Sequence, residues 1–78
     1  MTEINLSGRD LAVYEAVAEL EDEANAPHLH DIARHAELDL DETRESVRRL
    51  TNEHRLLHEV QDTARTDVGP AYELAPRT

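Results

Sequence analysis

The 78-residue sequence contains no cysteine, no lysine, no phenylalanine and no tryptophan, and it has only two glycines. Without cysteine there is no disulfide, no thiolate zinc site and no cysteine nucleophile. The two glycines lie far apart, so no glycine-rich loop is available to hold a phosphate group. The serines and histidines form no nucleophile motif. We therefore expect neither a catalytic site nor a cofactor, and we do not interpret the chain as an enzyme.

Long apolar runs are also missing. No segment approaches the roughly 20 apolar residues that are needed to cross a bilayer, and the N-terminus lacks a basic and then apolar secretory signal. A chain of this length forms one small domain, here residues 1–78, with a core that uses nearly every apolar residue. We expect a cytoplasmic protein without a membrane partner.

Positive charge is scarce. Eighteen acidic residues face eight basic residues, all of them arginine, which gives a formal net charge of −10. Such acidity argues against a polyanionic partner in dilute salt. It is also typical of proteins that work in molar potassium chloride, where the Debye length is only about 3 Å. We therefore expect a halophilic archaeal source, with an acidic mesophilic protein as the alternative.

Apolar residues recur at spacings of three and four along most of the first two thirds of the chain, which is the period of amphipathic helices. Asn25 and Pro27 interrupt this pattern once. Leu38 breaks it again and is expected to fill a tight corner. The sequence thus predicts helices at about 8–23, 29–36 and 40–54, with inward faces formed by Val13, Ala16, Val17, Leu20, Ile32, Ala33, Ala36, Thr43, Val47, Leu50 and His54.

Capping patterns support two of these helix starts. Asp39 precedes the third predicted helix, and Glu42 follows three residues later, which is the spacing of a capping box. Ser7 and Asp10 have the same spacing at the start of the first predicted helix.

The remaining residues, from about 56 to 74, predict a β-hairpin. Its strands are expected at 56–62 and 70–74, and the polar segment between them contains the turn formers Asp67 and Gly69. Alternation along the return strand places Tyr72 and Leu74 on one inward side, opposite Leu57 or Val60.

The segment 29–50 reads L-H-D-I-A-R-H-A-E-L-D-L-D-E-T-R-E-S-V-R-R-L. Together with the hairpin after it, this segment resembles the winged helix-turn-helix domain of archaeal and bacterial transcription regulators. Those regulators share the Ile32-Ala33 pair, the small residue at 36 and the corner before the last helix. The resemblance is nearest to the MarR and ArsR types in a minimal form. It implies an α+β fold of three helices followed by a two-stranded hairpin wing, with a short strand just before the second helix.

The resemblance also implies that the third helix enters the major groove of DNA while the wing lies over the flanking backbone. Arg44 and Arg48 share a helix face and can each form paired bonds to guanine, and Glu45 can accept from cytosine. Arg49 and Arg55 lie toward the helix end, where phosphate contacts are expected. The function expected is therefore a small DNA-binding transcription regulator that contacts double-stranded DNA through Arg44, Glu45, Arg48, Arg49, Arg55 and, near the wing tip, Arg65.

The same arginines have a second interpretation, as members of surface ion pairs. Asp41 lies three residues before Arg44. Glu45 lies three residues before Arg48 and four before Arg49. The alternative function is therefore a winged helix that contacts another protein in a transcription or regulatory complex, with the acidic first helix as its docking surface. A DNA-mimicking inhibitor is a third alternative. A homodimer is also expected, through the first helix or the hairpin edge, because it would match a palindromic site.

Five histidines raise the question of a metal site. His54 and His58 are four residues apart, but the predicted helix ends between them, so they do not form a ligand pair on one helix face. We expect no metal site and interpret the histidines as surface or capping residues.

Overall fold

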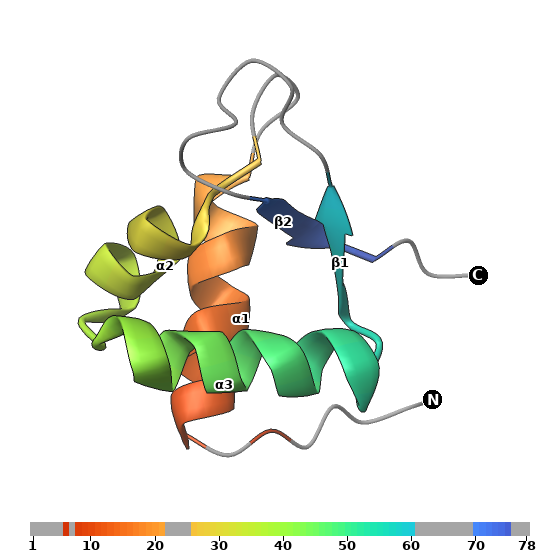
Figure 1. Cartoon of the computed structure of the whole chain (residues 1–78), viewed down its shortest axis with the longest axis horizontal. Helices are drawn as coiled ribbons and strands as arrows, with labels where there is room; N and C mark the ends of the chain where they lie inside the picture. The colour runs from red at the N-terminus through yellow and green to blue at the C-terminus, as the bar shows by residue number, and fades with distance from the viewer. Residues whose placement is uncertain (1–5, 7, 22–25, 61–69, 76–78) are drawn as a thin grey trace.

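The computed structural model describes residues 6, 8–21, 26–60 and 70–75. Three helices are followed by two antiparallel strands (Figure 1). This α+β arrangement confirms the predicted fold class and is consistent with a winged helix. The elements in chain order are α1 (Gly8–Leu20), α2 (Leu29–Ala36), α3 (Leu40–Asn52), β1 (Leu57–Val60) and β2 (Ala71–Leu74).

The helix ends differ in part from expectation. α2 begins and ends as predicted, whereas α1 ends at Leu20 rather than near 23, and α3 ends at Asn52 rather than near 54. After α3, Arg55 adopts a left-handed conformation with φ of 57°. The N–H of Leu56 then donates to a carbonyl near the end of α3 at 2.8 Å. This reversal leads the chain into β1 and leaves His54 exposed, so the prediction that His54 continues the inward stripe is wrong.

The core lies where α1 crosses α3, with α2 on one side and the hairpin on the other (Figure 1). Most of the predicted inward residues of the three helices are buried in it, whereas Leu20 and Ala36 are only half-buried. Burial of apolar surface is the main force that holds such elements together. The buried core cluster consists of Val13, Ala16, Val17, Ile32, Val47, Leu50 and Leu57.

The corner between α2 and α3 depends on three local features. Glu37 ends α2 in the left-handed region, with φ of 58°. Leu38 packs against the core, as the sequence predicts. At the start of α3, the N–H of Glu42 donates to the Asp39 carboxylate at 2.8 Å, and the Glu42 carboxylate accepts from the Asp39 N–H at 3.3 Å. The predicted capping box is therefore confirmed, and it fixes where α3 begins.

One edge of β2 pairs with β1, and the opposite edge is bonded to the segment between α1 and α2. Across the first edge, Leu57 pairs with Leu74, whereas Tyr72 lies opposite Glu59 rather than Val60. Along the second edge, the N–H of Tyr72 donates to the carbonyl of Pro27 at 2.9 Å, and the N–H of Leu74 donates to the carboxylate of Glu21 at 2.7 Å.

A single antiparallel bridge between His28 and Ala71 lies beside these two bonds. It stands where a short strand before the second helix was expected. The predicted turn at 63–69 and the predicted cap at Ser7 lie outside the described residues. In the described part of the chain, none of the helices has both the length and the apolar character that crossing a bilayer requires.

Replacing Glu37 with glycine should stabilise the protein. A residue with a Cβ loses about 1–2 kcal/mol in the left-handed region, while glycine loses about 0.5–1 kcal/mol of extra chain entropy, so the net gain should be about 0.5–1 kcal/mol. Urea unfolding measures this change. The matched control is Glu53→Gly at the end of α3, where φ is −94° and ψ is −48°. That substitution should destabilise, and equal effects at both positions would contradict the explanation.

Candidate functional site

The helix α3 has two long edges of different character. One edge faces α1 and carries Glu42, Glu45 and Arg49, which all bond to side chains of α1. The other edge faces the hairpin and lines a groove. Asp41, whose side chain is 92% exposed, lies on the outer face of the helix between these two edges.

On the α1 edge, Arg49 is held by Asp10. Its Nε and Nη2 atoms donate to the two carboxylate oxygens of Asp10 at 3.0 and 2.7 Å, and Nη2 also donates to the Ser46 hydroxyl at 3.3 Å. The Asp10 residue is only 4% exposed. The hydrogen bonds from Arg49 hold the pKa of Asp10 below its ordinary value. Arg49, which the sequence predicted as a phosphate contact, is thus bonded to α1 through the Nε and Nη2 edge of its guanidinium.

Glu45 is also engaged on this edge. Arg9 of α1 lies 3.3 Å from the Glu45 carboxylate and 3.6 Å from that of Glu42. The sequence had suggested pairs of Glu45 with Arg48 and Arg49, but Glu45 pairs with Arg9 instead. These side chains are substantially exposed, so the pairs add little stability, yet they place one positive charge beside two of the acids of α3.

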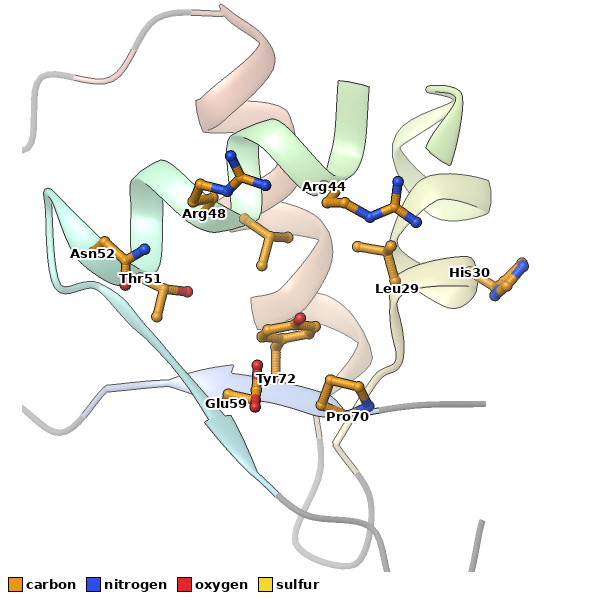
Figure 2. A pocket seen from close by; sticks show the side chains of 10 residues that line it. Leu29, His30, Arg44, Arg48, Thr51, Asn52, Glu59, Pro70 and Tyr72 are labelled. Atoms are coloured by element: carbon orange, nitrogen blue, oxygen red, sulfur yellow. The ribbon is translucent and has the colours of Figure 1, made fainter. Parts of the chain in front are cut away.

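The groove on the other edge lies between α3, the start of α2 and the hairpin (Figure 2), and its volume is about 520 Å³. Figure 2 shows Arg44 and Arg48 on the α3 side, with the ring of Tyr72 between β2 and α3. Burial, followed by the nearby charge of Glu59, raises the pKa of Tyr72, so its hydroxyl stays protonated and can donate. The described residues that line the groove are Leu29, His30, Arg44, Val47, Arg48, Thr51, Asn52, Glu59, Pro70 and Tyr72.

The groove is less acidic than the chain as a whole. Two guanidinium groups line it, but Glu59 is the sole carboxylate among its described lining residues. The guanidinium of Arg44 lies 3.1 Å from Asp41, which confirms the predicted pair. Among the described residues, no carboxylate lies within 4.0 Å of Arg48. Both arginines are exposed, as the sequence predicted.

The other predicted site residues are more scattered. Arg55 is exposed in the turn that follows α3, and Arg65 lies outside the described residues. Sequence reasoning did not select Thr51 and Asn52, although their spacings of three and four from Arg48 place them on the same face. Tyr72 was predicted to point inward, and its role in lining the groove depends on the packing of the hairpin against α3.

The acidic side chains around α1 are mostly bonded within the protein. Asp10 binds Arg49, Glu19 lies 3.6 Å from His35, and Glu21 accepts from β2. Glu15 is exposed. The other acids of the run that ends the predicted first helix lie outside the described residues. Asp10 and Glu21 are therefore occupied within the chain, whereas Glu15 and Glu19 stay exposed.

Three of the five described histidines, His28 among them, lie close to a carboxylate. His35 contacts Glu19, and His58 on β1 contacts Glu73 on β2. His28 is buried at the start of α2. No group of three or more potential metal ligands occurs among the described residues.

Comparison of the chain with protein-family models, with curated proteins and with solved structures gave no match. The class of protein is therefore defined by the fold itself, an α+β arrangement of three helices and an antiparallel hairpin that is consistent with a winged helix.

The Asp10–Arg49 pair should give the protein a distinct acid sensitivity. The folded pKa of Asp10 lies below its ordinary value of 3.8, so the pair stabilises the fold above about pH 4, and this stability is lost as the pH falls through the folded pKa. Asp10→Asn should cost about 1–3 kcal/mol at neutral pH. Between pH 7 and about pH 3, the free energy of unfolding measured in urea should fall less in the variant than in the wild type.

The matched control for this experiment is Glu15→Gln, which removes one carboxylate from the exposed face of the same helix. It should leave both the stability and its pH dependence nearly unchanged. If Asp10→Asn and the wild type lost equal stability in acid, the pair would not be the source of the sensitivity.

Proposed function

We propose that this protein is a small DNA-binding transcription regulator of the winged helix-turn-helix class, a minimal form of the MarR and ArsR types. In this proposal α3 lies in the major groove, and the hairpin lies over the flanking backbone. The supporting observation is the pair of exposed arginines that line the groove beside α3, of which Arg48 has no carboxylate partner among the described residues, in a chain whose formal net charge is −10. Exposed arginines gathered along one helix edge favour a polyanionic partner.

The groove-facing edge of α3 offers chemistry that suits base edges. Arg48 can donate two parallel bonds to the O6 and N7 atoms of guanine, and Asn52 can bond the N6 and N7 atoms of adenine. Arg44 can do the same as Arg48 once it leaves Asp41. The protonated hydroxyl of Tyr72 can donate to a phosphate oxygen, which would position the duplex rather than read its sequence.

Two residues take changed roles in this proposal. Arg49 positions α3 against α1, because its guanidinium is bonded to Asp10 and Ser46. Glu45 remains a candidate acceptor for cytosine, but it must first leave Arg9. Arg55 and Arg65 stay in the proposed interface as phosphate contacts.

A halophilic, cytoplasmic setting accords with this function. In molar potassium chloride, the repulsion between the duplex and distant carboxylates is screened within about 3 Å, so contacts in the groove decide binding. A homodimer on a palindromic site remains part of the proposal.

The alternative is a winged helix that binds another protein through an acidic α1. It has weaker support, because Asp10 and Glu21 are engaged within the chain and only Glu15 and Glu19 of the described acids of this segment stay exposed. Nuclease treatment of native complexes separates the two functions, since a protein partner would stay bound and a DNA partner would not.

Removing a groove arginine should weaken DNA binding strongly. Arg48→Ala and Arg44→Ala should each lower the affinity for a selected duplex by about 5- to 150-fold, which corresponds to about 1–3 kcal/mol. Arg48→Lys should keep part of the affinity but lose selectivity, because lysine cannot form the paired bonds to guanine. Fluorescence anisotropy in molar potassium chloride, with duplexes selected from a random pool, measures both quantities.

The matched control is Arg9→Ala, which removes the same charge from α1, on the side of α3 away from the groove. It should reduce affinity much less than Arg48→Ala. Equal losses would show that net charge alone governs binding, and failure of the wild type to prefer any duplex would overturn the proposed function.

A further inference from the structure

Asp41 stands out on the face of α3 that is proposed to meet DNA. Its side chain is 92% exposed, and it lies in the first turn of the helix, where the helix dipole favours a negative charge. It holds the guanidinium of Arg44 at 3.1 Å. An acid at this place repels the phosphates of an approaching duplex and also occupies one of the two arginines of the groove.

Resting on the proposed function, we propose that Asp41 is an internal competitor of DNA that sets the salt dependence of binding. In the free protein, Asp41 satisfies Arg44. When an acceptor on the duplex takes over Arg44, the Asp41 carboxylate is released next to the phosphates. The carboxylate that has lost its arginine partner takes up a cation from solution, here potassium, in place of the guanidinium.

This exchange opposes the usual effect of salt. Each protein contact with a B-DNA phosphate releases about 0.9 cation, which makes affinity fall as salt rises. Uptake of one cation at Asp41 cancels about one such release. The logarithm of affinity should therefore fall less steeply with the logarithm of salt concentration than the number of arginine contacts implies.

The competitor acts most strongly in dilute salt, where it lowers affinity for any phosphate backbone. Toward molar salt its effect fades, because cations to fill the vacated carboxylate are abundant. Asp41 thereby limits non-specific attraction while leaving contacts with base edges intact.

The test is Asp41→Asn in the full chain, with binding followed over a ten-fold range of potassium chloride. The probe is a duplex selected by the wild type from a random pool. At the low end of the range the variant should bind about 10-fold more tightly than the wild type, and at the high end the two affinities should converge. The plot of the logarithm of affinity against the logarithm of salt concentration should therefore be steeper for the variant by about one unit. Circular dichroism checks that the variant folds.

The control is Glu15→Gln, which removes the same charge from the exposed face of α1 and should leave the slope unchanged. A second arm repeats Asp41→Asn in an Arg44→Gln background, where no pair exists to be exchanged and the change in slope should shrink. Binding with equal slopes for wild type and Asp41→Asn, or an undiminished change in the Arg44→Gln background, would overturn the inference. Absence of duplex binding by the wild type would instead overturn the proposed function.

Discussion

The bonds between the Asp10 carboxylate and the Arg49 guanidinium act together with the buried stripe of α3 to fix the rotation of that helix about its own axis. Asp10 is almost fully buried, and a buried carboxylate without partners would cost several kcal/mol. Arg49 must therefore face α1. Because successive residues of an α-helix are rotated by about 100°, this constraint turns Arg44 and Arg48 toward the hairpin. The groove and its charge follow from that rotation.

Charge is sorted between the two edges of α3 by pairs that individually contribute little. Arg9 lies beside both Glu42 and Glu45 on the α1 edge, and exposed pairs of this kind are worth at most about 1 kcal/mol each. Their importance lies in their position. They keep carboxylates of α3 beside a cation and away from the groove, so the groove has a local field that a formal net charge of −10 does not describe. At high salt, where only near charges interact, the local field governs recognition.

Much of the fold could be predicted because its signals are local. Residues within about four positions of one another set each confirmed local feature. These features are the ends of α2, the capping box of Asp39 and Glu42, and the pairing of Arg44 with Asp41. The helix ends were less predictable. The inward spacing of His54 continues the stripe of α3, but the chain reverses at Arg55 to reach β1, and periodicity carries no signal of that reversal.

The sequence by itself determined the order of elements, the buried faces of the helices and the exposure of Arg44 and Arg48, because apolar period and capping act over one or two helix turns. Only the tertiary structure decided the partners of Arg9 and Arg49, which lie 36 and 39 residues away in the chain. It also decided that Tyr72 faces α3 across a groove. Contacts between segments so distant depend on how the helices and the hairpin pack together, and side-chain spacing along one segment contains no information about that packing.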